Sequence, residues 1–289
     1  MSRLKTVLLL GALTGLLLFL GDIAGGRTGL TLALGIAGVM NVGAWWFSDR
    51  IVLAMHHARE ASESSAPRLH AIVAELAARA GIPKPRIFVV DDPSPNAFAT
   101  GRDPAHGVVA VTTGLVGLLG ESELRGVLAH ELGHIRNRDT LVTTVAATMA
   151  GAISYLTHVL FFFGGGGSDD RRGNPLAALA LLILSPLIAV ILQMALSRTR
   201  EFRADEYGAE IAGGGEPLAR ALLALERASG RVRPRVMQPE FAPLYIVHPF
   251  STRGLGRLFS THPSTEDRVR RLMKRSPGIA AFWNPQEVR

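Results

Sequence analysis

Long apolar stretches alternate with polar ones along this 289-residue chain. Four of them approach the roughly 20 residues that a membrane helix needs, and they occupy residues 6–21, 29–48, 140–163 and 175–197. The first stretch is short and follows Arg3 and Lys5, which is also the pattern of a signal peptide. No convincing small-residue cleavage site follows, and the second apolar stretch begins at once. We therefore favour a retained helical hairpin.

The remaining segments show the periodicities of a water-exposed domain. Helical spacing is found over residues 66–80, 121–135, 201–211, 217–229 and 267–274. Strands are expected over residues 86–90 and 108–112. The Pro-, Asn- and Gly-rich stretch between them, 91–107, is expected to form a loop or a short irregular strand. Residues 231–256 are rich in Pro and Arg, match no motif, and are expected to form loops.

Composition agrees with a membrane protein. Hydrophobic residues make up 48% of the chain and charged residues only 19%, and the mean hydropathy is +0.25. The net charge is +7, but no nucleic-acid-binding module is recognisable, so the basic residues are expected to face anionic lipid and no nucleic-acid partner is expected. The chain has no cysteine, which excludes disulfides and thiolate metal ligands. Any metal site must therefore use His, Asp or Glu.

The most informative motif is HExxH at residues 130–134. His130 and His134 are four positions apart, so they share one face of the expected helix and both imidazoles can reach one zinc ion. Glu131 lies beside them, where it can take a proton from a zinc-bound water, whose pKa zinc lowers to about 7. The alternative is a chance match on a solvated helix. The long apolar stretch that follows is not expected of such a helix.

A catalytic zinc site uses three protein ligands, and Glu201 in the stretch SRTREFRAD is the best candidate for the third. Asp205, one helical turn further on, would accept a hydrogen bond from a ligand imidazole. The alternative is that both are ordinary surface acids beside arginines. Helix lengths favour the site, because an antiparallel hairpin with 29 residues after His134 and 27 residues before Glu201 has arms of about 44 Å and about 41 Å. Glu201 would then return to the depth of His134.

The HExxH motif before an apolar hairpin, followed by SRxREFxAD, resembles the HtpX family of membrane zinc metalloproteases. Two further segments agree, PNAFATG at residues 95–101 and His262-Pro263 followed by Arg268. The resemblance covers nearly the whole chain. It implies Glu201 as the third ligand of one zinc ion per chain, a cytoplasmic catalytic domain, and quality-control proteolysis of membrane or misfolded proteins.

The same resemblance adds two weaker candidates. His262 would donate to the oxyanion of the tetrahedral intermediate, although a lone His before Pro is more often structural. Arg268 is a further candidate without an assigned role. Asn96, Ala97, Phe98 and Ala99 are candidates for substrate binding, because an edge strand there would pair with an extended substrate backbone. A plain turn is the alternative, and the residues alone favour it.

Together these observations predict an α-helical integral membrane protein with a mainly α, zincin-like metalloprotease domain that carries a small β-sheet. The expected organisation is an N-terminal hairpin at residues 1–49, a first catalytic part at 50–139, a second hairpin at 140–197 and a second catalytic part at 198–289. Nine basic residues flank the spans on the side of the termini, against three on the other side. By the positive-inside rule the active site lies in the cytoplasm, and the resemblance implies a bacterial inner membrane.

The expected function is a zinc endopeptidase that acts on protein substrates at a lipid bilayer. The alternative from another class is a non-catalytic zinc-binding membrane scaffold or stress sensor. Glu131 argues against that alternative, because a structural site needs no base. An intramembrane protease fits less well, because the polar stretch 136–139 follows the motif at once and places it at the membrane surface.

Overall fold

The structure is a computed structural model that describes residues 2–146, 198–229, 246 and 263–274. Helices predominate among these residues, and the strands form one mixed sheet. The strands are β1 (Arg59–Glu60), β2 (Arg86–Val90), β3 (Ala97–Thr100) and β4 (Val108–Thr112). The helices are α1 (Ser2–Met55), α2 (Pro67–Ala80), α3 (Thr113–Leu118), α4 (Glu121–Arg136), α7 (Arg198–Ala212), α8 (Glu216–Ser229) and α9 (Thr265–Lys274), with a 3-10 turn η1 (Pro104–His106). Residues 139–146 are also helical.

The sheet has the order β1-β2-β4-β3, so β3 is an edge strand. β2 and β4 are parallel, whereas β1 and β3 run antiparallel to their neighbours. Side chains alternate between two faces. Val109 and Val111 of β4 pack in the larger core with α2 and α4, while Val108 and Ala110 pack against the end of α1 around Leu53. Because both faces are covered, β2 and β4 are apolar almost throughout.

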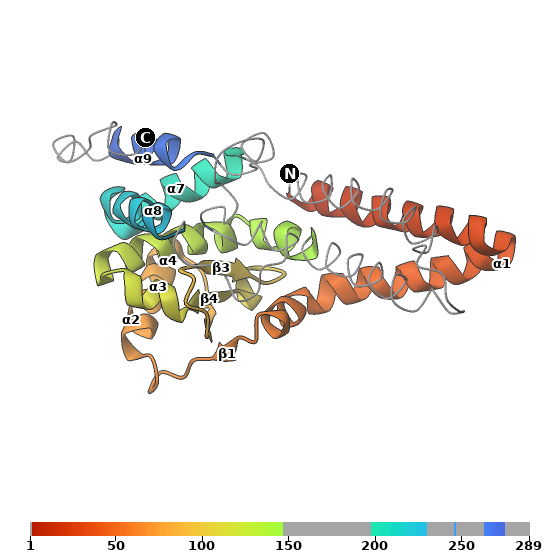
Figure 1. Cartoon of the computed structure of the whole chain (residues 1–289), viewed down its shortest axis with the longest axis horizontal. Coiled ribbons are helices and arrows are strands. Elements are labelled where there is room, and N and C mark those ends of the chain that lie inside the picture. Colours follow the sequence, from red (N-terminus) through yellow and green to blue (C-terminus); the bar gives the residue numbers. More distant parts are fainter. Residues whose placement is uncertain (1, 147–197, 230–245, 247–262, 275–289) are drawn as a thin grey trace, which may run out of the picture.

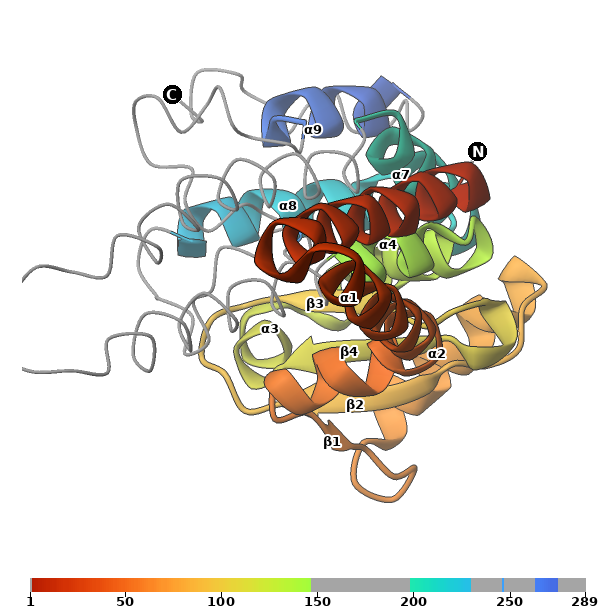
Figure 2. The ribbon, with the colours of Figure 1, turned by 90° about the vertical axis from the view of Figure 1, so that its right-hand side faces the viewer.

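Helix α4 is the centre of the domain. Figures 1 and 2 show it between the sheet and the helices α7, α8 and α9. Two glycines permit the close approach of its neighbours. A Cβ atom at Gly208 of α7 would lie 2.9 Å from the backbone nitrogen of His130, and one at Gly126 of α4 would lie 2.4 Å from the backbone nitrogen of Leu218. Larger side chains at these positions would push the helices apart.

Helix α1 folds back on itself into two arms that extend away from the domain (Figure 1). The Nδ2 atom of Asn41 donates to Oγ1 of Thr14 at 2.7 Å. In a straight helix these residues would lie about 40 Å apart, so the contact requires antiparallel arms. Gly26, whose φ is +55°, lies between the two contact residues, and this left-handed conformation suits a residue without a side chain.

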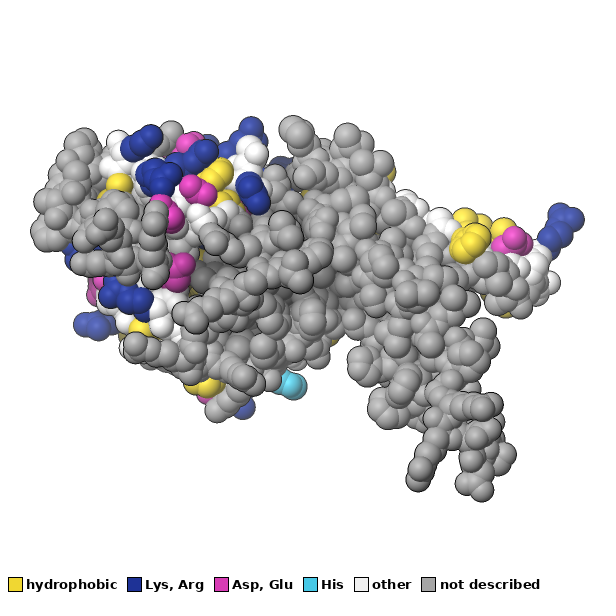
Figure 3. Space-filling model, turned by 45° about the horizontal axis from the view of Figure 1, so that its top comes forward, with side chains coloured by type: hydrophobic (Ala, Val, Ile, Leu, Met, Phe, Trp, Pro, Cys, Tyr) yellow, Lys and Arg dark blue, Asp and Glu magenta, His cyan; other side chains and the backbone are white. Residues whose placement is uncertain are grey.

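One helical segment in the described part of the chain, Gly26–Phe47, is long and apolar enough to cross a membrane, with a mean hydropathy of 1.5. It contains most of the expected span 29–48, and the expected span 6–21 lies in the other arm of α1. The expected hairpin at 140–197 falls, after residue 146, outside the described residues. Figure 3 shows charged side chains gathered over the globular end, whereas apolar ones are visible on the far arm, with a few charged ones at its tip.

The five helices and the two strands predicted for the water-exposed part are confirmed, with boundaries that differ by at most three residues. The irregular stretch 91–107 contains the edge strand β3 and the turn η1. Two elements were not expected. The strand β1 has only two residues, and α3 is a six-residue helix that begins directly after β4, where the Oγ1 atom of Thr112 accepts from the backbone N–H of Leu115.

Candidate metal centre

The HExxH residues lie in the second half of α4 and are largely buried. His130 and His134 are one turn apart, and their rings meet edge to face with centroids 4.7 Å apart. Their Nε2 atoms are 3.2 Å apart. Two nitrogens that each lie 2.0–2.1 Å from one tetrahedral zinc ion are about 3.3 Å apart. The two imidazoles therefore already have the separation of ligands that share an ion.

Helix α7 brings Glu201 to the same point. One carboxylate oxygen, Oε1, lies 3.5 Å from Nε2 of His134, and the other, Oε2, lies 3.8 Å from Nε2 of His130. The three side chains offer ligand atoms that all lie within 4.8 Å of one another. The expected meeting of Glu201 with the HExxH helix is thus observed. The hairpin that the length argument used lies outside the described residues.

Asp205 and Arg268 support His130 from behind. Asp205 Oδ1 lies 2.9 Å from Nδ1 of His130, and the guanidinium of Arg268 donates to both oxygens of Asp205 at 2.7 Å and 2.9 Å. Burial favours a neutral Asp205, but Arg268 and the hydrogen bond with His130 outweigh it and hold the pKa of Asp205 below its usual value. Burial, followed by the charge of Arg268, lowers the pKa of His130. A neutral His130 with Nδ1–H on Asp205 presents the Nε2 lone pair to a metal.

His134 has its own acidic neighbour, which we did not expect from the sequence. Oδ2 of Asp139 lies 3.6 Å from Nδ1 of His134, and its other oxygen lies 3.8 Å from Nη1 of Arg200. Asp139 follows the motif by five residues, just beyond the end of α4. The sequence feature that points to Asp139 is an acidic residue about one turn after a ligand His, in a stretch that otherwise carries arginines.

The charges of the centre suit a divalent cation. Four carboxylates and two guanidinium groups converge here, which gives a formal charge of −2 when the imidazoles are neutral. The carboxylates are those of Glu131, Glu201, Asp205 and Asp139, and the guanidinium groups are those of Arg268 and Arg200. Burial alone would lower the pKa of His134, but the surrounding carboxylates, Glu201 first, raise it to about 9. The same negative charge that raises the pKa of His134 would stabilise a divalent cation, so the donor set fits a metal.

Glu131 is buried beside this cluster. Burial, supported by the charge of Glu201, raises the pKa of Glu131 to about 7. The backbone N–H of Ala99 donates a hydrogen bond to its carboxylate. The HExxH glutamate is therefore tied to the edge strand and is balanced between its charged and neutral forms near neutral pH.

The edge strand β3 passes alongside α4. The backbone N–H of Thr112 donates to the carbonyl of Asn96 at 2.9 Å, so this pair is hydrogen-bonded across the strands. Bonded and non-bonded pairs alternate in antiparallel strands, which turns the N–H and C=O groups of Ala97 and Ala99 towards the outer edge. The hydrogen bond from Ala99 to Glu131 agrees with this register. The plain turn considered for this stretch is not observed.

The other expected site residues occupy different positions. The side chain of Asn96 is buried, and its Oδ1 accepts from the backbone N–H of Ile246. The carbonyl of Ile246 in turn accepts from Nη1 of Arg268. Ile246 therefore joins the edge strand to the Asp205 support, a role that no sequence pattern indicated. Phe98 packs on the sheet face opposite α4. His262 lies outside the described residues.

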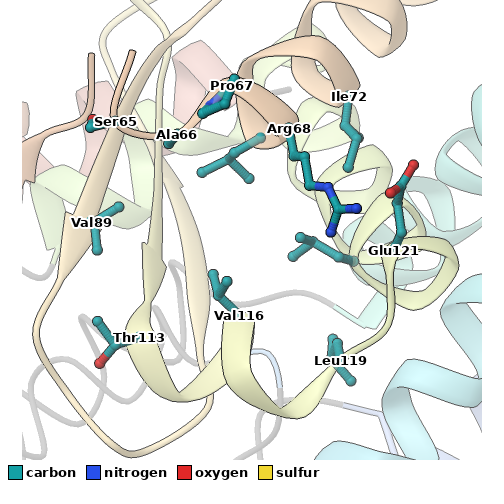
Figure 4. A pocket seen from close by; sticks show the side chains of 12 residues that line it. Ser65, Ala66, Pro67, Arg68, Ile72, Val89, Thr113, Val116, Leu119 and Glu121 are labelled. Carbon is teal, nitrogen blue, oxygen red and sulfur yellow. The ribbon is translucent and has the colours of Figure 1, made fainter. Parts of the chain in front are cut away.

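A separate apolar cavity of about 480 Å³ lies between α2, α3 and the start of α4 (Figure 4). Ile72, Val89, Val116 and Leu124 are among its lining residues, and Arg68 and Glu121 lie on one side of it. None of the metal-centre residues lines it. The cavity is therefore separate from the candidate metal ligands on α4 and α7.

Comparisons with known proteins point to one group. The sequence pattern of peptidase family M48 matches residues 63–276. A Protease HtpX homolog from Ralstonia pickettii (strain 12J) is 49% identical over 273 residues, which cover 94% of this chain and 96% of that protein. A Protease HtpX homolog from Methylibium petroleiphilum is 48% identical over 278 residues, which cover 96% of this chain and 98% of that protein.

A similar fold occurs in the crystal structure of S. mikatae Ste24p. The TM-score is 0.52 at 19% sequence identity, and the match covers 93% of this chain and 65% of the Ste24p chain. At this identity the likeness concerns the fold alone.

Proposed function

The chain is a membrane metalloprotease that belongs to peptidase family M48 and to its HtpX group, and on that premise we propose that it is a zinc endopeptidase acting at the cytoplasmic face of a bacterial inner membrane. Its proposed substrates are membrane or misfolded proteins, in a quality-control role. The observation that carries the proposal is the joining of His130, His134 and Glu201 beside the buried Glu131.

His130, His134 and Glu201 would hold the ion, one per chain. Two imidazoles and one carboxylate suit zinc better than the harder divalent cations. When bound, zinc supplies a Lewis acid and lowers the pKa of a water ligand to about 7. Asp205, positioned by Arg268, fixes the tautomer and orientation of His130. Asp139 does the same for His134 over a longer distance.

Glu131 is the proposed general base. It takes a proton from the attacking water and delivers a proton to the leaving amine nitrogen. A carboxyl whose pKa is near the working pH does both efficiently, and burial places Glu131 there. His262 is proposed to donate a hydrogen bond to the oxyanion that forms at the substrate carbonyl.

The outer edge of β3 is the proposed substrate platform. The backbone groups of Ala97 and the carbonyl of Ala99 would pair with an extended peptide, which brings the scissile bond towards Glu131, to which the N–H of Ala99 donates. Phe98 contributes backbone to the same strand. Asn96 has a positioning role, since its side chain holds Ile246.

We propose that the chain consists of a membrane hairpin at 1–49, a catalytic part at 50–139, a second membrane hairpin at 140–197 and a second catalytic part at 198–289. The two arms of α1 and the apolar segment Gly26–Phe47 support the first hairpin. In sealed inside-out vesicles an added protease should cut the stretch between Arg50 and Asp139. Cleavage from the external face instead would reverse the proposed orientation.

The alternative of a non-catalytic zinc scaffold or stress sensor is disfavoured, because the relatives are proteases and Glu131 serves no structural site. The direct test is metal analysis of the purified full chain, combined with a casein cleavage assay before and after chelation. We expect one zinc per chain, loss of cleavage on chelation, and recovery with stoichiometric zinc. Cleavage that persists in metal-free protein would reject the proposal.

A further inference from the structure

A second polar feature of the molecule lies where the second arm of α1 meets the domain. It is a cavity of about 400 Å³ whose wall includes Trp46, Asp49, Arg50, Lys84, Arg86 and Arg102. These residues come from the end of α1, the approach to β2 and the connection after β3. The turn η1 completes the wall. We call this cavity the juxtamembrane basic pocket.

The pocket carries an excess of positive charge. Its wall has four cationic side chains and one carboxylate, Asp49, which lies 3.6 Å from Arg86. Lys84 also pairs with Glu63 at 2.6 Å, and Arg102 lies 3.9 Å from Asp103. Even with those two outer acids, the cations outnumber the carboxylates. Among the described residues, no carboxylate lies within ion-pair distance of Arg50.

The pocket begins where the candidate membrane span ends. Gly26–Phe47 is that span, and Trp45, Trp46 and Phe47 at its end are exposed. Aromatic side chains at a span end mark the membrane–water interface. The guanidinium of Arg102 lies 4.6 Å from the centre of the Trp46 ring. This contact places a cationic wall residue of the pocket at the depth of lipid headgroups.

An apolar track leads into the pocket from the membrane side. Val39, Val42 and Trp46 are spaced i, i+3 and i+7, so they share one face of α1. Val39 and Val42 are among the most exposed large apolar side chains in the described part of the chain, at 76% and 63%. The acyl chain of a lipid ligand would lie along this face of α1, and its polar headgroup would lie in the pocket.

We propose that the juxtamembrane basic pocket binds the phosphate of an anionic phospholipid. Guanidinium groups donate paired hydrogen bonds to phosphate oxygens, and basic pockets beside membrane helices suit acidic headgroups. The proposal rests on the proposed orientation of the domain towards the lipid surface. A free phosphate offers the same headgroup chemistry but makes no use of the apolar track, so the lipid is the assigned source. A bound headgroup would join α1 to the connection between β3 and β4.

The test is a titration of the purified full chain in neutral detergent by native mass spectrometry. Phosphatidylglycerol, phosphatidylcholine and inorganic phosphate are the three probes. The variants are Arg50→Gln with Arg102→Gln, the charge-keeping pair Arg50→Lys with Arg102→Lys, and a control pair, Arg220→Gln with Arg270→Gln. The control removes the same charge from two half-exposed arginines on α8 and α9, away from the pocket.

We expect the parent chain to bind phosphatidylglycerol about 10-fold more tightly than phosphatidylcholine. The Gln pair should weaken phosphatidylglycerol binding about 30-fold, because each arginine near an anionic lipid contributes about fivefold in affinity. The Lys pair should lose less than about fivefold, because the charge remains while the paired geometry is lost. The control pair should bind as the parent does. Helical circular dichroism checks folding, and if the Gln pair fails this check, Arg50→Gln alone should show about fivefold weakening.

Three results would overturn the proposal. The first is equal affinity for both lipids in the parent chain. The second is loss of phosphatidylglycerol binding in the control pair to the same extent as in the Gln pair. The third is inorganic phosphate that binds as tightly as phosphatidylglycerol and competes with it fully, which would assign the pocket to a free anion. None of these outcomes bears on the zinc centre, whose activity assay is separate.

Discussion

The Nδ1 atom of His130 lies 2.9 Å from Oδ1 of Asp205, so an acid on α7 sets the orientation of an imidazole on α4. Both side chains are only 2% exposed. Arg268 holds Asp205 from the other side with two hydrogen bonds. Packing within the protein thus decides which ring nitrogen of His130 faces His134 and Glu201.

Replacing Asp205 by Asn should weaken metal binding. The amide keeps the shape of the side chain but removes the charge that holds Nδ1–H of His130 and that neutralises buried Arg268. Loss of an outer partner of this kind costs about 10- to 100-fold in metal affinity or activity. Competition with a chromophoric zinc chelator measures the affinity. Unchanged zinc affinity would show that Asp205 does not orient His130.

The contact between α4 and α7 at Gly208 should control the metal centre. A Cβ atom there would lie 2.9 Å from the backbone nitrogen of His130 and 3.0 Å from its Cα. Because backbone atoms cannot rotate away, Gly208→Ala should separate the helices and cost about 1–3 kcal/mol of stability, with lower zinc occupancy. Gly117→Ala is the matched control, since nothing lies within 4 Å of the added atom. Equal thermal midpoints in the two variants would contradict the close packing.

Zinc binding should release a proton from His134. Burial opposes a charged His134, but the nearby carboxylates prevail and raise its pKa to about 9 in the metal-free centre. At pH 7 the metal must displace that proton, so zinc affinity should rise with pH until about 9 and then level off. Calorimetry in buffers of different ionisation enthalpy counts the released protons. A count of zero at pH 7 would mean that His134 is neutral before binding.

Substitutions of Glu201 should affect the metal itself. Glu201→Ala removes the third ligand, and Glu201→Gln keeps the volume but offers a neutral amide, which is a poorer zinc ligand than a carboxylate. We expect zinc occupancy to fall in both, most in the Ala variant. Glu206→Gln, on the same helix but outside the cluster, is the control. Full zinc occupancy in Glu201→Ala would move the third ligand elsewhere.

Local patterns were enough to predict the metal centre's helices. The HExxH spacing depends only on helix geometry, and α4 has the predicted start at Glu121. The burial of β2 and β4 on both faces likewise agrees with their continuous apolar runs. The SRTREFRAD stretch singles out Glu201, and the matching arm lengths support it, although most of that hairpin lies outside the described residues.

Features that depend on long-range contacts were not predictable. The strand β3 lies between Pro95 and Gly101 and becomes a strand by pairing with β4. The position of Arg268 was known from a motif, but its partner Asp205 is set by how α9 packs on α7. The backbone of Ile246 carries no chemical signature in the sequence, since any residue offers the same N–H and C=O groups.

Glu131 is proposed to move protons and not to hold the metal. Glu131→Gln in the full chain, assayed for bound zinc and for casein cleavage in the same preparation, tests it most directly. We expect one zinc per chain, as in the parent, with cleavage reduced by about 100-fold or more. Full cleavage with zinc in place would contradict the assignment of Glu131, and loss of zinc together with cleavage would make it a ligand.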